Sequence, residues 1–189
     1  ADVLTRGRAD AALIASMVKV VFSILAPNAA GPVELLRELR RDLVPLMDNH
    51  FLTALYTVID RERMLLQVGR AGHDPVLVLR RRTREIFRVN PRGRLITAEF
   101  SENFELAEFA LEEHDWVILY TDCITEAANA DGEFYGEPRF HDFILAASVR
   151  DANGFLEDLL DELRAWNGNR DTFDDDFTIL VVDIKQPPV

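Results

Sequence analysis

The order of periodic patterns along the chain constrains its fold more than any other feature. Apolar residues at helical spacing come first, in residues 10–25 and 32–47, and return in 137–148 and 152–166. Segments rich in β-branched and aromatic residues lie between and after them, namely 51–60, 63–70, 75–81, 85–89, 104–111, 116–120 and 177–184. Because helices and strands do not alternate, this order predicts an α+β fold with antiparallel sheets, not a doubly wound parallel sheet.

Consecutive strand segments pair into two predicted hairpins. The first turns at residues 60–62, between segments 51–60 and 63–70. The second turns within the one basic run of the chain, Arg80–Arg84. We expect this run to be a solvated loop, and a role in docking an acidic partner is the alternative.

The first helical segment is also the best candidate for a membrane span. It is shorter than the roughly 18–20 apolar residues that a span needs, and Ser16, Lys19 and Ser23 interrupt it. We therefore expect a helix that faces the core and no contact of this domain with a membrane. The core-facing residues at helical spacing are Leu13, Ile14, Met17, Val18, Val21 and Leu25.

Composition excludes several classes of protein. The 189 residues suit one domain, spanning 1–189, and 48% of them are hydrophobic, enough for a substantial core. The net charge of −12 argues against a nucleic-acid surface, which needs clustered Lys and Arg. A single cysteine excludes an internal disulfide and fits a reducing compartment, so we expect a cytoplasmic protein.

Two acidic groups adjoin predicted strands. The apolar run 117–120 ends at Thr121 and Asp122, and the acidic cluster Asp174-Asp175-Asp176 directly precedes the last strand segment. Acidic groups at strand ends that are distant in sequence can meet across a sheet. Carboxylate oxygens are the ligands that Mg²⁺ and Mn²⁺ prefer, so the pattern predicts a site for such a cation.

The same segments carry a family resemblance. Residues 120–127, Y-T-D-C-I-T-E-A, resemble the Y-T-D-G-[VI]-T-E-A signature of the SpoIIE/RsbU-type serine/threonine phosphatases, bacterial members of the metal-dependent (PPM, type-2C-like) superfamily. Further matches follow the family's order: A-D-V at 1–3, F-L-T-A-L-Y at 51–56, A-G-H-D-P at 71–75, G-E-F-Y-G-E-P-R-F at 132–140 and D-D-F-T at 175–178. The ordered motifs cover nearly the whole chain.

The resemblance implies a fold and a set of ligands. The implied fold is an α-β-β-α sandwich of two antiparallel sheets flanked by helices, here without its opening strand or strands. The implied metal ligands are Asp2, the backbone carbonyl of Val3, Asp122 and Asp175. Asp174 and Asp176 are alternatives to Asp175 within one residue of register.

The resemblance also implies the chemistry. A complete family site holds two Mn²⁺ or Mg²⁺ ions, and a metal-activated water, not a protein side chain, attacks the phosphorus. No catalytic residue is therefore assigned beyond the metal ligands. Supporting roles are expected for Thr121, Gly72, His73 and Cys123. For His73 a structural turn, with the ring hydrogen-bonded to the backbone, is favoured over a role as general acid; Cys123 is expected to be packed and inert.

The chain departs from the family pattern at several places. The upstream G-G-D-[FY]-[YF]-D motif is absent, so we expect a fragment of a longer chain that holds one ion weakly or none. Leu4-Thr5-Arg6-Gly7 replaces S-G-H-G, the later P-L-G turn is missing, and Cys123 replaces a glycine. If position 123 requires a positive φ, cysteine there is strained by roughly 1–2 kcal/mol.

Two functions follow from these observations. The first is a metal-dependent phosphatase that dephosphorylates a STAS-type anti-anti-sigma factor, or a similar phosphoprotein, in the partner-switching pathways that regulate sigma factors in stress responses. The second is a degenerate phosphatase fold that binds a signalling partner without turnover. The resemblance also implies a sensor or receiver domain upstream, and it leaves a homodimer open.

Overall fold

The computed structural model describes residues 2–4, 8–47, 50–100, 103–168 and 177–185, with side chains described from residue 12 onward. The chain forms two compact units, each described by itself. Unit 1 comprises Ala1–Pro75 and Val89–Ala110, and unit 2 comprises Val76–Arg88 and Leu111–Val189. No helix in the described part of the chain combines the length and hydrophobicity that crossing a membrane requires.

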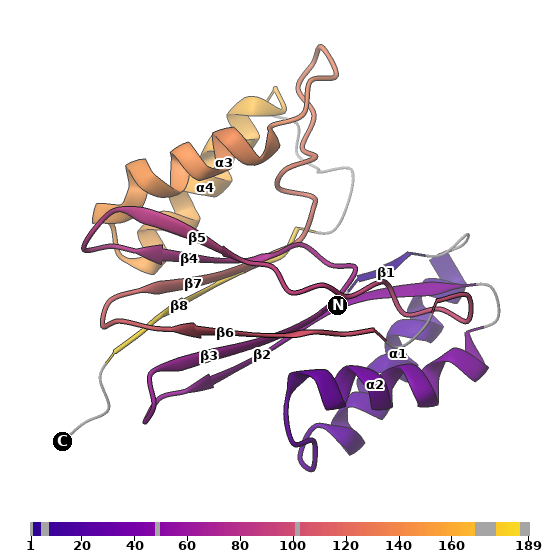
Figure 1. The fold of residues 1–189 in the computed structure, drawn as a ribbon. Helices are drawn as coiled ribbons and strands as arrows, with labels where there is room; N and C mark the ends of the chain where they lie inside the picture. Colours follow the sequence, from indigo (N-terminus) through magenta and orange to yellow (C-terminus); the bar gives the residue numbers. More distant parts are fainter. Residues whose placement is uncertain (1, 5–7, 48–49, 101–102, 169–176, 186–189) are drawn as a thin grey trace. The chain divides into compact units, whose positions relative to one another are not determined.

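Unit 1 is an antiparallel sheet covered by two helices. Its strands pair in the order β1-β2-β3-β6. Figure 1 shows both helices beside the β2–β3 part of this sheet. The elements are β1 (Asp2–Leu4), α1 (Arg8–Leu25), α2 (Pro32–Leu43), the 3₁₀ turn η1 (Val44–Leu46), β2 (Phe51–Asp60), β3 (Leu65–Ala71) and β6 (Leu106–Ala110).

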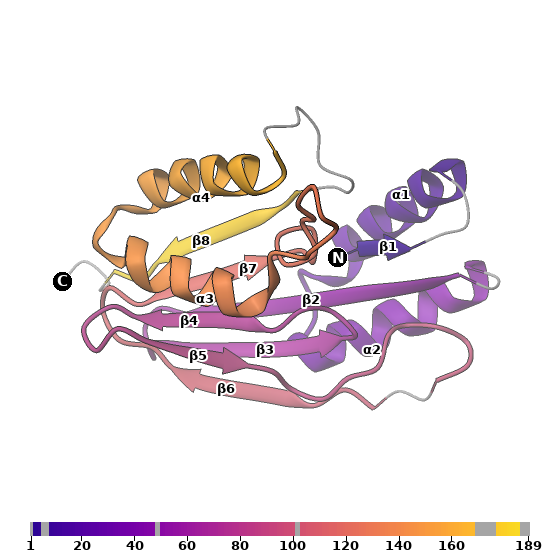
Figure 2. The same ribbon diagram turned by 90° about the horizontal axis from the view of Figure 1, so that it is seen from above.

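Unit 2 is also an antiparallel sheet with two α-helices, but its strands follow a different order. Its strands pair in the order β5-β4-β7-β8. Figures 1 and 2 both show the two long helices on one face of the sheet. The elements are β4 (Val76–Arg80), β5 (Glu85–Val89), β7 (Trp116–Tyr120), α3 (Gly136–Ala146), the 3₁₀ turn η2 (Ala147–Val149), α4 (Ala152–Trp166) and β8 (Ile179–Asp183).

These elements confirm the α+β class and the two antiparallel sheets flanked by helices. The predicted segments differ from the observed elements mainly at their ends. The helix predicted over 32–47 ends at Leu43 and continues as a 3₁₀ turn, because Pro45 cannot donate the next helical hydrogen bond. The strand predicted from residue 63 begins at Leu65, because residues 61–64 make the turn, where Asp60 accepts a hydrogen bond from the Arg63 amide at 2.9 Å.

Each unit has its own core. Leu35, Leu36, Leu39 and Leu43 of α2 are buried in unit 1. In unit 2, β7 lies between β4 and β8 in the strand order, and four of its five residues are buried, which explains its continuous apolar run. The largest side chains of this second core are Trp116, Tyr135, Phe140 and Phe155.

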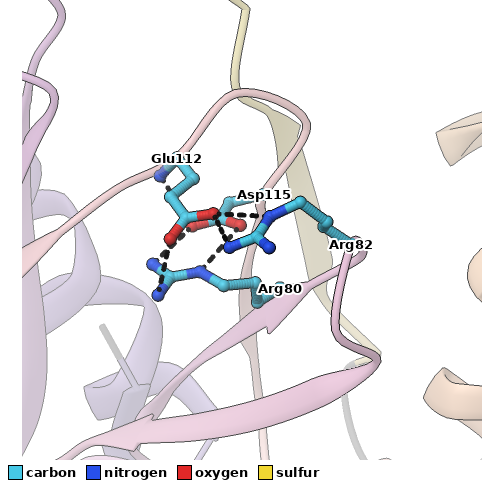
Figure 3. A network of polar contacts seen from close by, with 4 residues as sticks. All are labelled: Arg80, Arg82, Glu112 and Asp115. Carbon is cyan, nitrogen blue, oxygen red and sulfur yellow. Dashed lines mark hydrogen bonds and ion pairs between the residues drawn. The ribbon is translucent and has the colours of Figure 1, made fainter.

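One expectation about side chains was wrong. Leu13 does not face the core: its side chain is 62% exposed, whereas its neighbour Ile14 is buried. The basic run at 80–84 forms the β4–β5 turn as expected, and residues 82–84 are exposed. Arg81 and Arg84 donate hydrogen bonds to backbone carbonyls at the end of α3 and in the residues after it, and Arg80 pairs with a buried carboxylate, Asp115 (Figure 3).

Candidate metal centre and its supporting residues

Asp122 lies just beyond the carboxyl end of β7, in a turn held by its own hydrogen bonds. The amide of Ile124 donates to the carbonyl of Thr121 at 3.2 Å. The carbonyl of Asp122 accepts from the amide of Glu126 at 2.8 Å and from the hydroxyl of Thr125 at 3.1 Å. These bonds fix the backbone of Asp122, and they occupy its carbonyl oxygen, not its carboxylate.

The carboxylate of Asp122 has no hydrogen-bond donor within the described part of the chain. The residue is partly exposed. In the described part of the chain, Asp122 therefore does not cap its own turn, the ordinary use of an aspartate at such a place. Oxygen lone pairs without a protein donor are available to water or to a hard cation.

A pair of threonines joins this turn to the segment after the acidic cluster. The amide of Thr121 donates to the carbonyl of Thr178 at 3.1 Å, and the amide of Thr178 donates to the Thr121 hydroxyl at 3.2 Å. Thr178 is the last residue of D-D-F-T and lies three residues after Asp175. The end of the closing motif therefore lies beside the end of β7. Asp174, Asp175 and Asp176 themselves lie outside the described residues.

Asp2 and Val3 lie on β1, in unit 1. The backbone of Asp2 is opposite Thr53 on β2, and that of Val3 is opposite Leu52. The strand extends the sheet of unit 1 and was not among the strand segments expected from the sequence. The role of both residues as ligands stays a prediction, since their side chains are outside the described set.

Thr53 also adjoins the A-G-H-D-P turn. Its hydroxyl oxygen lies 3.4 Å from Nδ1 of His73, which is buried. Arg70 donates to the carbonyl of His73 and, at 3.1 Å, to the carbonyl of Pro91. Burial is the largest cause that lowers the pKa of His73 to about 4, ahead of the positive charges of the N-terminal amine and of Arg70, so the ring is neutral at neutral pH. A neutral ring does not serve as an acid there, which favours the structural role; the expected bond from the ring to the backbone stays a prediction.

Gly72 shapes that turn. Its φ is +70°, a conformation that glycine adopts without strain. A Cβ at this position would come within 2.9 Å of the Cβ of Leu95. The Gly72 amide donates to the carbonyl of Gly93 at 2.9 Å. Gly72 is thus required by the backbone path and by close packing.

Cys123 does not strain the Asp122 turn. It is a buried free thiol at 6% exposure, which agrees with the packed position expected. Among the described residues other than glycine, the positive φ values belong to Met64, Arg84 and His114. Cys123 therefore does not have a positive φ, and the strain of roughly 1–2 kcal/mol that a positive φ would cause there is absent.

Comparisons with known proteins identify the family of this chain. The sequence profile of the SpoIIE family (Stage II sporulation protein E) matches residues 2–185. The chain belongs to the SpoIIE family. Phosphoserine phosphatase RsbU of Bacillus subtilis is 24% identical over 183 residues, which are 96% of this chain and 53% of RsbU. This SpoIIE-family chain therefore spans about half the length of that curated relative.

Solved structures show the same fold for this SpoIIE-family domain. The RsbU and RsbW domains of a Mycobacterium tuberculosis protein superpose with a TM-score of 0.83 at 20% identity, over 100% of this chain and 51% of that one. The SiaA-PP2C domain of Pseudomonas aeruginosa gives 0.77 at 18% identity, over 93% and 69%. The catalytic domain of the phosphatase PstP, in complex with two manganese ions, gives 0.64 at 13% identity, over 95% and 84%.

The described residues hold part of the ligand set that the SpoIIE family implies. No group of three or more His, Cys, Asp or Glu side chains placed to share a metal ion occurs among them. Asp122 is the one expected ligand whose side chain is described, and its carboxylate fits a hard cation. Thr53 and Thr178 were not expected to support the site, although both stand inside family motifs. Their position beside expected site residues was the available signal.

Proposed function

We propose that this chain is the catalytic domain of a metal-dependent protein serine/threonine phosphatase. The observation that carries the proposal is the hydrogen-bonded pair Thr121–Thr178, which holds the end of the closing acidic motif beside Asp122. Membership of the SpoIIE family and the similarity to the phosphoserine phosphatase RsbU support the same reaction.

In this proposal Asp2, the carbonyl of Val3, Asp122 and Asp175 hold Mn²⁺ or Mg²⁺, with Asp176 as the neighbouring alternative to Asp175. The bound cation supplies Lewis acidity, which lowers the pKa of water and neutralises phosphoryl charge. The protein's contribution would be to position the carboxylates: the turn bonds hold the backbone of Asp122, and the threonine pair holds Thr178, three residues after Asp175. No protein side chain acts as nucleophile.

The substrate we propose is a phosphorylated STAS-type anti-anti-sigma protein in partner-switching signalling. The similarity to RsbU, and to a Mycobacterium tuberculosis protein that contains RsbU and RsbW domains, supports this class of pathway. An upstream sensor or receiver domain, a homodimer and a cytoplasmic location remain predictions of the same proposal. The alternative of an adaptor without turnover also remains a prediction. Cys123 no longer favours that alternative, because the backbone of Cys123 is not in the left-handed region.

The deciding experiment measures phosphate release from a phosphoserine STAS-domain substrate as Mn²⁺ is titrated into the full-length protein that carries this chain. Asp122→Asn should lower the Mn²⁺-dependent kcat/KM by at least about 100-fold. Asp161→Asn, an 80% exposed carboxylate on α4, is the matched control and should change it less than about twofold. A folded protein that binds the substrate without turnover would instead establish the adaptor.

A further inference from the structure

The end of α4 is hydrogen-bonded to the segment that carries Asp122. Trp166 is the last residue of α4, and its Nε1 donates to the carbonyl oxygen of Ala127 at 2.9 Å. The same oxygen accepts the amide of Tyr135, also at 2.9 Å. Ala127 is the last residue of Y-T-D-C-I-T-E-A, and the amide of Glu126 before it donates to the carbonyl of Asp122. The indole of Trp166 is thus linked to the backbone of Asp122 through two adjacent residues.

Trp166 also stands at the start of the connection to the acidic cluster. In the sequence, residues 167–177 join α4 to Thr178 and include Asp174-Asp175-Asp176. Thr178, at the far end of this connection, is bonded to Thr121, directly before Asp122. The residues on both sides of the connection are therefore tied to the segment 120–127. Fixing both ends of a connection restricts the positions that a carboxylate within it can reach.

The indole ring is itself held by the motif G-E-F-Y-G-E-P-R-F, which has no role in the proposed reaction so far. The ring of Tyr135 meets the indole edge-on, with the ring centroids 5.7 Å apart. The guanidinium of Arg139 lies over the indole, 4.5 Å from its centroid, and pairs with Glu133 at 2.7 Å. Edge-on aromatic contacts and cation–π contacts both depend on the orientation of the ring. Three residues of this motif thus orient the donor of the bond to Ala127.

We propose that Trp166 is a positioning residue of the candidate metal centre. It holds the backbone that follows Asp122 to the start of the connection that carries Asp174-Asp175-Asp176, and it touches neither metal nor substrate. The motif at 132–140 orients its ring. The inference rests on the phosphatase function proposed above, and it adds a residue that belongs to none of the family motifs. Groups that orient metal ligands without binding the metal typically change metal affinity by 10- to 100-fold when they are replaced.

The other tryptophan of the chain provides a matched comparison. Trp116 begins β7, is completely buried, and packs edge-on against Phe155 with centroids 5.3 Å apart. Its Nε1 has no hydrogen-bond partner in the part of the chain that the structure describes. Asp122 lies beyond the opposite end of the strand. Replacing Trp116 therefore removes core contacts, but no described hydrogen bond to the segment that carries Asp122.

The test compares Trp166→Phe with Trp116→Phe in the full-length protein that carries this chain. Phenylalanine keeps an aromatic ring at residue 166 but cannot donate to Ala127. In metal-free Trp166→Phe, hydrogen exchange in peptides covering residues 122–136 should become about three- to tenfold faster, because local opening loses one hydrogen bond, while exchange in β4 stays within about twofold. The Kd for Mn²⁺, measured by calorimetry, should rise about tenfold.

The control variant separates positioning from stability. Trp116→Phe should lower the Tm at least as far as Trp166→Phe does, because its ring is completely buried. Its Kd for Mn²⁺ should nevertheless stay within about twofold of wild type, and its exchange in 122–136 should rise no more than that in β4.

Several results would overturn the proposal. These are unchanged exchange in residues 122–136 of Trp166→Phe, a rise that is equal throughout unit 2, an unchanged Kd for Mn²⁺, or an equal loss of Mn²⁺ affinity in Trp116→Phe. If the wild type itself binds no Mn²⁺, the proposed phosphatase site fails. Hydrogen exchange in the metal-free protein then still decides whether Trp166 positions the segment that carries Asp122.

Discussion

At the scale of single residues, uncharged hydroxyl groups contact the segments that carry the expected ligands. Thr121 is buried and accepts the amide hydrogen bond of Thr178, while Thr53 contacts buried His73 and lies opposite Asp2. Each threonine thus lies next to a residue that the family pattern expects at the metal. In the proposed site, hydroxyl groups that bind no metal themselves would help to position the backbone that carries the carboxylates.

Replacing Thr121 tests this positioning directly. Thr121→Val keeps the shape of the side chain but leaves the Thr178 amide without its acceptor, so we expect a loss of about 1–2 kcal/mol in the free energy of unfolding. If the bond also positions the acidic motif, Mn²⁺ binding measured by calorimetry should weaken by roughly 10-fold. Thr121→Ser retains the hydroxyl and is the matched control. Equal stability of the valine and serine variants would contradict this assignment.

His73 makes a pH-dependent contribution to stability. Its pKa is about 4 in the folded protein and near 6.5 when unfolded, so the unfolded state binds the proton first as pH falls. The stability from the neutral ring is complete above pH 6.5 and decreases towards pH 4, by about 2–3 kcal/mol. Urea unfolding of wild type and His73→Gln at both pH values measures it. The variant should lose less stability on acidification than wild type, and equal losses would show that His73 does not carry the effect.

At the scale of elements, α1 carries two neighbouring apolar stripes with different surroundings. Ile14 is 4% exposed in the core of unit 1, whereas Leu13, Val20 and Ile24 are 59–65% exposed. Helical spacing placed Leu13 and Ile14 on one broad apolar face. Periodicity shows which residues share a face, but not which part of a wide face the sheet covers.

Adjacent substitutions on α1 should therefore differ sharply. Ile14→Ala should lower the free energy of unfolding by about 2–4 kcal/mol, because it removes buried methyl groups and leaves a cavity. Leu13→Ala should change it by less than about 0.5 kcal/mol, because that side chain is already in water. Guanidinium unfolding of both variants measures the difference. Equal costs would show that α1 packs through a different face.

At the scale of the whole molecule, the expected ligands are distributed over both units. Asp2 belongs to unit 1, and Asp122 and Asp175 belong to unit 2. The family profile extends over residues 2–185 and therefore includes parts of both. The expectation of one domain over 1–189 stays a prediction, as does the full set of ligands.

The sequence by itself determined the α+β class, the order of the strands along the chain from β2 onward, the family and the place of Asp122 at a strand end. These follow from local periodicity and from motifs of a few residues, whose spacing is preserved in the linear chain. Only the tertiary structure decided that Thr121 pairs with Thr178, that Thr53 contacts His73, and that Asp115 is buried against Arg80. Such contacts join residues up to 57 positions apart. Local propensity and the pattern of charges along the chain do not specify which distant groups come within hydrogen-bond distance when the chain folds.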